Sequence, residues 1–197
     1  GSKGIPKKNI ISLKGKPLIS YTIRASLESE VCETWVSTDS DEISDISMKF
    51  GARVLKRPAE LAEDDSSTES VLIHFAENID FDVIVLLQAT CPLVTAQDIN
   101  GGLNMMAQFD SVVSVTELSQ FVWIENTPCY DLFQRPRRQE RSAHFLETGS
   151  FFITTKSHLL QSRNRISGSV GLFRVPKARS FDIDSYDDLA VVERLLT

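Results

Sequence analysis

The stretch FDVIVLLQ (residues 81–88), followed by ATCP (residues 89–92), decides which kind of fold this chain can adopt. Its apolar residues are nearly continuous, as expected of a β-strand that is covered on both faces. Strands of this kind are typical of sheets that carry helices on each side. The polar residues and Pro92 that follow indicate that the strand ends in a loop of limited freedom.

On both sides of this stretch, predicted strands alternate with predicted helices. Ile19, Ile23 and Leu27 are spaced four residues apart, which indicates an amphipathic helix entered through Pro17. Either Ser40 or Asp41 can cap the next helix. Helices are predicted over 17–27, 41–50, 69–78, 98–108, 156–161 and 186–196, and strands over 33–38, 52–56, 111–115, 149–154 and 171–175.

This alternation predicts an α/β fold with a mostly parallel central sheet. In such sheets the ligand crevice lies outside the carboxyl ends of the strands. The polar segments 1–9, 37–39 and 88–92 would then lie together at one edge of the sheet, as loops that follow strands.

The composition is typical of one globular domain. The 197 residues are 42% hydrophobic and 24% charged, which is enough to bury a core. The formal net charge of −6 argues against nucleic acid as the main partner, because duplex phosphates need a broad basic face. No apolar run approaches the ~20 residues that span a membrane. The three cysteines lack C-x-x-C spacing, which indicates reduced thiols rather than disulfides or a zinc site.

The first nine residues, GSKGIPKKN, reverse the sign of this acidic chain locally. Glycines let backbone N–H groups line a concave anion site, and lysines add positive charge that suits phosphate oxygens. We interpret this segment as a phosphate-binding loop. The alternative interpretation is a solvated terminus that happens to carry lysines.

Asp182 and Asp184 alternate with apolar residues in FDIDS (residues 181–185). On an extended segment both carboxylates face the same side, and two hard oxygen ligands suit Mg²⁺. The alternative is that Asp184 or Ser185 only caps the last helix.

Other polar residues are less specific. Gln88 and Thr90 follow a predicted strand and can contact a base or a sugar, although an ordinary turn would also place them there. Arg57 either pairs with Asp64 or Asp65 or reaches a ligand. Cys91 has no evident histidine partner, so thiol catalysis is not expected, and the histidines lack metal-ligand spacing (His74, His144 and His158).

Residues 118–148 interrupt the alternation. Aromatic residues precede the basic run RPRRQER (residues 135–141), and aromatics beside arginines are typical of an interface or a binding arm. The alternative is a long surface excursion without such a role.

Taken in order, six segments resemble the N-acylneuraminate cytidylyltransferase (CMP-sialic acid synthetase) family. They are GSKGIPKKNI, WVSTDSDEI with FGARVLKRPAELAEDDSST, LLQATCPL, RPRRQ, ETGSFFI and FDIDSYDDL. RPRRQ and GSFF resemble the animal-type enzymes. The resemblance implies one domain over residues 1–197 with a three-layer, Rossmann-like nucleotidyltransferase fold, and an inserted arm at 118–148 that exchanges between the subunits of a homodimer or a dimer of dimers.

The resemblance also implies roles for individual residues. Lys3, Lys8, Asp182 and Asp184 would be catalytic, with Asp182 and Asp184 ligating Mg²⁺ or Mn²⁺. Gln88, Arg138, Gln139, Phe151 and Phe152 would bind the sialic acid, and CTP would contact Ser2, Lys3, Lys8, Asn9, Arg57, Ser67, Gln88 and Thr90.

The implied reaction joins CTP and N-acetylneuraminic acid into CMP-sialic acid and pyrophosphate. Two alternatives stay open: a cytidylyltransferase for another sugar acid (legionaminic, pseudaminic or ketodeoxyoctonic acid), and a non-catalytic relative that binds CTP. The resemblance further implies a soluble intracellular protein of the cytoplasm or nucleus, or of the Golgi lumen if a signal was removed. A first strand is expected before residue 1.

Overall fold

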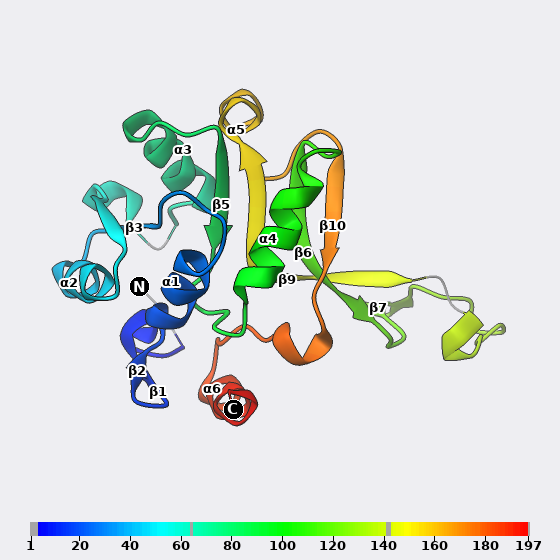
Figure 1. The fold of residues 1–197 in the computed structure, drawn as a ribbon. Helices are drawn as coiled ribbons and strands as arrows, with labels where there is room; N and C mark the ends of the chain where they lie inside the picture. The colour runs from blue at the N-terminus through cyan, green and yellow to red at the C-terminus, as the bar shows by residue number, and fades with distance from the viewer. Residues whose placement is uncertain (1–3, 64, 141–142, 197) are drawn as a thin grey trace.

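The computed structural model describes residues 4–63, 65–140 and 143–196, apart from the side chain of Arg138. Its centre is a four-stranded sheet with the strand order β10-β6-β9-β5 (Figure 1). β10 pairs parallel with β6, whereas β9 pairs antiparallel with both β6 and β5. β5, β6 and β10 therefore run in one direction, as predicted for a mostly parallel sheet. β9 runs in the opposite direction, so the sheet is mixed. These strands are β5 (Val83–Leu87), β6 (Ser111–Leu118), β9 (His144–Thr155) and β10 (Val170–Arg174).

Both faces of β5 are covered, as its apolar run predicts. Ile84 and Leu86 pack in a cluster with Leu72 and Leu159, which come from α3 and α5 on one face. Val85 and Leu87 pack against the cluster on the other face, to which α1 and α4 contribute. The covering helices are α1 (Ile19–Leu27), α3 (Thr68–Asn78), α4 (Ala96–Met105) and α5 (Lys156–Ser162).

Most of the remaining elements lie beside β5 or below the end where β5 stops, whereas η3 lies in a projecting segment described below (Figure 1). β3 and β4 form a separate parallel pair next to α2, and the hairpin β1–β2 packs near α6 (Figure 1). None of the helices in the described part of the chain is long and apolar enough to cross a membrane. The elements are β1 (Ser12–Leu13), β2 (Lys16–Pro17), β3 (Trp35–Thr38), α2 (Asp41–Lys49), β4 (Arg53–Lys56), α6 (Tyr186–Leu195), and the 3-10 helices η1 (Lys8–Ile10), η2 (Ala59–Leu61), η3 (Arg138–Glu140) and η4 (Lys177–Arg179).

Side-chain caps set where several helices begin. Ser40, rather than Asp41, caps α2 by accepting a hydrogen bond from the Ile43 backbone N–H. Thr95 with Asp98 and Ser185 with Asp188 form capping boxes at α4 and α6. Each cap satisfies a backbone donor that has no partner within its own helix.

β6 and β9 are longer than predicted, because they continue past the main sheet and pair with each other as far as Leu118 and His144. Between them, β7 (Trp123–Ile124) and β8 (Thr127–Pro128) form a short hairpin. This segment, with η3, extends away from the body of the protein and is called the arm below (Figure 1). Residues 118–140 and 143–148 are its described part.

One buried ion pair ties η4 to α4. The Arg179 guanidinium donates a hydrogen bond to Asp98 Oδ1 at 2.6 Å. Asp98 Oδ2 also accepts from the hydroxyl and the backbone N–H of Thr95, at 2.8 and 3.1 Å. Asp98 is therefore both the N3 partner of Thr95 in the α4 capping box and the anchor of the chain just before Asp182.

We expect Asp98→Ala to lower the free energy of unfolding by about 2–3 kcal/mol, because it removes a cap and leaves a partly buried guanidinium without its carboxylate. Urea denaturation measures this change. The control is Glu28→Ala, which removes the partner of Arg24 in an exposed ion pair and should have little effect. Equal effects of the two substitutions would contradict the anchoring role of Asp98.

Candidate active site

The N-terminal loop lies against the segment that carries the two aspartates. A Cβ added at Gly4 would come within 2.4 Å of the Asp184 carbonyl oxygen, so only glycine permits this approach. Ile5 and Ile183 are both fully buried and share one apolar cluster with Leu93. The packing therefore holds the loop and the aspartate segment together.

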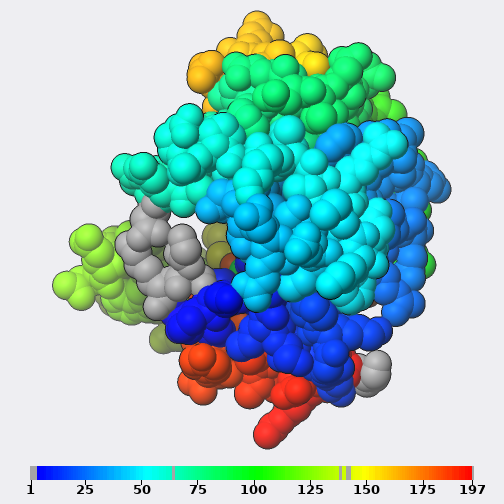
Figure 2. All heavy atoms as spheres, turned by 90° about the vertical axis from the view of Figure 1, so that its left-hand side faces the viewer, coloured from blue at the N-terminus to red at the C-terminus, as the bar shows by residue number. Residues whose placement is uncertain are grey.

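The turn at residues 88–92 joins the same site. The Ile183 backbone N–H donates to the Thr90 carbonyl at 2.9 Å. Ala89 packs in a second cluster with Ile10 and with Val36, near the ends of η1 and β3. Figure 2 shows the blue N-terminal segment between the cyan segment around β4 and the red C-terminal segment. The described part of 1–9, the 88–92 turn and the 181–184 segment therefore lie together. Ser37 and Thr38 lie in β3 of the separate β3–β4 pair, so the meeting of 37–39 with these loops stays a prediction.

Lys8 and Asp184 form an ion pair across this junction. The Lys8 Nζ donates to Asp184 Oδ1 at 2.8 Å, and the side chains are 13% and 76% exposed. Lys7 instead reaches Glu42 in the first turn of α2, at 2.6 Å. Lys8 thus places a positive charge beside the aspartates. The Lys8 side chain is largely buried, whereas the Asp184 carboxylate that it binds is open to solvent.

Asp182 and Asp184 are not used to cap α6. Ser185 caps that helix, and the hydrogen bond from the Ser185 hydroxyl holds the pKa of Asp188 below its ordinary value. Ile183 between the aspartates is buried, so the two carboxylates project away from it. Of the two residues proposed as the alternative cap, Ser185 is the cap and Asp184 is not.

The aspartate pair fits a divalent cation. Asp182 Oδ1 is buried and has no hydrogen-bond partner among the described residues. A buried carboxylate oxygen without a partner is costly, and a Mg²⁺ or Mn²⁺ ion would satisfy it. The described residues hold no group of three or more His, Cys, Asp or Glu side chains suited to a metal. A bound ion would therefore take its other ligands from water and phosphate.

Cys91 lies beside Asp182 but is not a nucleophile. Burial, followed by the charge of Asp182, raises the pKa of Cys91 to about 12. The thiol is therefore protonated at neutral pH, as the absence of a histidine partner predicts. Its Sγ lies 3.6 Å from the Thr148 carbonyl oxygen, to which it donates a weak hydrogen bond.

Arg57 is held at the end of β3. Its guanidinium donates to the Ser37 carbonyl at 2.6 Å and to the Ser37 hydroxyl at 3.2 Å. Burial lowers the pKa of Arg57 from its ordinary value, against the opposing effect of Asp39. An arginine remains charged after such a shift, so Arg57 is a fixed cation at the end of the β3–β4 pair. Its predicted pairing with Asp65 is not seen, and Asp64 lies outside the described residues.

Several predicted site residues lie elsewhere or have another role. Ser67 caps α3 by accepting from the Ser70 backbone N–H at 3.1 Å. Asn9 lies in η1 and is half-buried near Lys8. Ser2 and Lys3, which were predicted to bind CTP, lie outside the described residues.

Phe151 and Phe152 do not form the wall of a sugar pocket. Phe151 is 0% exposed and packs on the α4 side of the sheet, with its ring 5.4 Å from that of Phe173. Phe152 faces the other side, under the Arg165 guanidinium. Both faces of this sheet are covered, so two neighbouring residues of β9 are both buried. We leave them out of the candidate binding residues.

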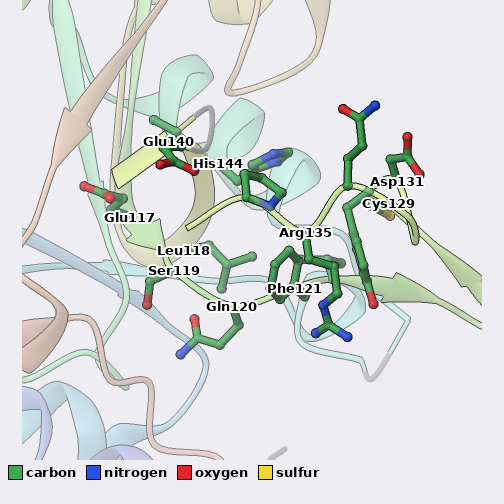
Figure 3. Close-up of a pocket in the computed structure, with 15 residues that line it drawn as sticks. Glu117, Leu118, Ser119, Gln120, Phe121, Cys129, Asp131, Arg135, Glu140 and His144 are labelled. Atoms are coloured by element: carbon green, nitrogen blue, oxygen red, sulfur yellow. The ribbon is translucent and has the colours of Figure 1, made fainter. Parts of the chain in front are cut away.

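The arm does not bring its basic run to this site within one chain. Gln139 is exposed in η3, and the side chain of Arg138 is outside the described residues. The arm has a hollow of about 590 Å³ of its own, which Figure 3 shows with Arg135 beside Phe121. The guanidinium stacks 4.6 Å from that ring, so this hollow is a feature of the arm and not of the loop cluster.

Sequence reasoning missed two contributors to the site. Ser37 orients Arg57, a contact that the predicted place of residues 37–39 at the sheet edge did not specify. The segment Thr148-Gly149-Ser150 supports the 88–92 turn. A glycine between two hydroxyl residues, at the start of an apolar strand, was the available signal for a bulge there.

Comparison with known proteins identifies the family of this chain. The family model described as cytidylyltransferase matches residues 1–195. The chain is 36% identical to N-acylneuraminate cytidylyltransferase B of Danio rerio, over 98% of this chain and 48% of that protein. It is 30% identical to the pseudaminic acid cytidylyltransferase of Campylobacter jejuni, over 96% of this chain and 89% of that protein.

A solved structure shares the fold. The CMP:2-keto-3-deoxy-manno-octonic acid synthetase complexed with CTP superimposes with a TM-score of 0.77 at 18% identity, over 100% of this chain and 94% of that chain. The chain spans about half the length of the Danio rerio relative. The family match over nearly every residue, together with the shared fold, shows that this chain belongs to the cytidylyltransferase family.

Proposed function

We propose that this protein activates N-acetylneuraminic acid by transferring CMP to it from CTP. The observation that carries the proposal is the meeting of Lys8, the Gln88–Thr90 turn and the Asp182–Asp184 pair at one edge of the sheet. The names of the relatives at 36% identity add the sugar acid. A cationic loop beside two carboxylates suits a nucleoside triphosphate bound with a divalent ion.

In this reaction the anomeric hydroxyl oxygen of the sugar bonds to the α-phosphorus of CTP. The bond from that phosphorus to the β-phosphate bridging oxygen breaks, and pyrophosphate leaves with the electron pair. The hydroxyl proton passes to solvent. Such a displacement needs alignment of two reactants and neutralisation of negative charge more than it needs a strong protein base.

Different residues of the chain would contact the phosphates, the sugar and the ribose. Lys8 lies where it can contact phosphate oxygens, because its Nζ already binds a carboxylate at the same position. Arg57 adds a fixed cation at the end of β3. The half-buried Gln88 amide and the Thr90 hydroxyl are suited to contact the sugar and ribose hydroxyls.

A divalent ion belongs to the proposal. Mg²⁺ or Mn²⁺ would be held by Asp182 and Asp184, and when bound it would neutralise phosphate charge and favour ionisation of the attacking hydroxyl. Because Lys8 binds Asp184 in this structure, the ion and Lys8 share one carboxylate. Lys8 would therefore turn toward the phosphates when the ion binds.

Two other functions remain as alternatives. A different acceptor is one, since a relative at 30% identity is named for pseudaminic acid. A CTP-binding protein without turnover is the other. We rank it below the enzyme because Lys8, Asp182 and Asp184 are all present and in one place.

We further propose a homodimer formed through the arm. The arm exposes large apolar side chains, and Phe133 is 97% exposed. Apolar groups of this size on a projecting segment favour a protein interface. A second copy would also explain how Gln139, exposed in η3, reaches a sugar site that it does not approach in its own chain.

The reaction is tested by pyrophosphate release from CTP and Mg²⁺. N-acetylneuraminic acid, ketodeoxyoctonic acid and a control without sugar are compared at one CTP concentration. We expect release that depends on N-acetylneuraminic acid. Release with another sugar acid alone would assign a different acceptor, and CTP binding without release would support the non-catalytic alternative.

The role of the aspartate pair is tested with Asp184→Ala. We expect its kcat to fall by about 10²-fold or more, because a charge that stabilises the transition state is lost. Asp184 is exposed, so the variant should keep its fold, which circular dichroism checks. The matched control is Asp187→Ala in the first turn of α6, which should stay near wild type. Normal turnover by a folded Asp184→Ala protein would refute the metal role.

The dimer is tested with Phe133→Asp, measured by analytical ultracentrifugation. We expect the variant to shift to monomer, since a charge in an apolar interface is costly to desolvate. Leu160→Asp, at an exposed apolar residue of α5 outside the arm, is the control and should remain dimeric. A monomeric wild type, or a dimeric Phe133→Asp variant, would overturn the arm interface.

A further inference from the structure

The pairing of β6 with β9 is interrupted beside the candidate site. The register passes from Val113 opposite Phe152 to Val115 opposite Glu147. One residue of β6, Ser114, therefore lies opposite the four residues 148–151 of β9. Such a bulge leaves backbone groups outside the regular ladder and redirects the chain.

Buried hydroxyl groups fill this interruption. Thr148 Oγ1 lies 2.8 Å from Ser114 Oγ and accepts from the Ser150 backbone N–H at 3.3 Å. Ser114 Oγ lies 3.0 Å from both the backbone N and the carbonyl oxygen of Phe151. Each hydroxyl has one proton, so a chain of hydrogen bonds can run from the Ser150 backbone N–H through Thr148 and Ser114 to the Phe151 carbonyl. The Ser150 hydroxyl lies 3.1 Å from Thr148 Oγ1 beside this chain. All three hydroxyl residues are buried.

The bulge contacts both ends of the 88–91 turn. The Gln88 backbone N–H donates to the Ser150 carbonyl at 3.4 Å, and the Cys91 thiol donates to the Thr148 carbonyl at 3.6 Å. Gly149 has a φ of +70°, and a Cβ there would lie 3.4 Å from the Gln88 side-chain oxygen. The Gln88 amide therefore lies over a glycine whose left-handed backbone the bulge maintains.

We propose that Thr148 is a positioning residue for nucleotidyl transfer. Its hydroxyl holds the shape of residues 148–150, and that shape places Gln88 and the turn that ends beside Asp182. The inference rests on the proposed function, in which Gln88 contacts the sugar and ribose. Thr148 itself touches no substrate.

The chain offers a matched control for removing this hydroxyl. Thr154 is a second buried threonine on β9, and its hydroxyl has no hydrogen-bond partner among the described residues. It pairs with Ser111 and Ile84, at the end of the sheet away from the site. Thr148→Val and Thr154→Val make the same chemical change on one strand, and Thr148→Ser retains the hydroxyl.

The first measurement is hydrogen exchange of the wild type and the three variants without substrates. Thr148→Val should accelerate exchange of the Gln88 and Cys91 amides by about tenfold, because local opening of the turn becomes easier. Thr154→Val and Thr148→Ser should leave both amides unchanged. Unchanged exchange in a folded Thr148→Val protein overturns the inference, whether or not the protein is active.

The second measurement is the kcat/KM of pyrophosphate release, well below the melting temperature of each variant. Thr148→Val should lose about 10–100-fold, as supporting partners of site residues do, and Thr148→Ser should restore the rate. In a protein that already carries Gln88→Ala, Thr148→Val should lower kcat/KM little further, because both substitutions act through the Gln88 side chain. If Thr148→Val lowers kcat/KM by the same factor with and without Gln88→Ala, Thr148 has a merely structural role and the inference is overturned.

The two proposals fail in different ways. If the wild type releases no pyrophosphate with any sugar acid while Thr148→Val still accelerates exchange at Gln88, the proposed function is wrong and the positioning of the turn stands. If the wild type is active and Thr148→Val matches Thr154→Val in both measurements, the positioning role is wrong and the function stands.

Discussion

Burial of Ile183 is the interaction on which the candidate site depends. Its side chain is fully buried with Ile5 of the N-terminal loop and Leu93. Burying a side chain of this size contributes about 1.5–3 kcal/mol. Residues 181–184 have no regular secondary structure, so this contact and the Ile183–Thr90 backbone hydrogen bond determine where the aspartates lie. Without the apolar cluster, the N-terminal loop and the two carboxylates would belong to unconnected parts of the surface.

Charge is the second constraint. The chain carries a net charge of −6, and the site gathers Asp182 and Asp184 with Asp188 nearby. Like charges at this spacing repel, and a nearby cation relieves them. Lys8 supplies that charge here, since it pairs with Asp184. The pKa of Asp188 is held below its ordinary value mainly by the hydrogen bond from the Ser185 hydroxyl, with a smaller contribution from the charge of Lys8. A triphosphate would bring further negative charge, which is why the proposed function includes a divalent ion as well as Lys8.

Prediction from sequence succeeded where the pattern within one short segment is enough to determine the local structure. The apolar run at 81–88 predicted a strand covered on both faces, and apolar clusters do pack on both faces of β5. It failed where a pattern has two physical explanations. Neighbouring aromatics on a strand are compatible with a pocket wall or with two covered faces, and Phe151 and Phe152 have the second role. A serine before a helix can bind phosphate or cap the helix, and Ser67 is a cap.

The sequence by itself determined the alternation of strands and helices, the approximate starts of the helices and the residue types available for chemistry. These depend on interactions within a few residues, such as that of Ser40 with Ile43. Only the tertiary structure decided which of those residues meet. Lys8 and Asp184 are 176 positions apart, and Asp98 and Arg179 are 81 apart. Such pairs follow from strand order, register and the shape of the core, because local periodicity carries no information about which distant segments pack together.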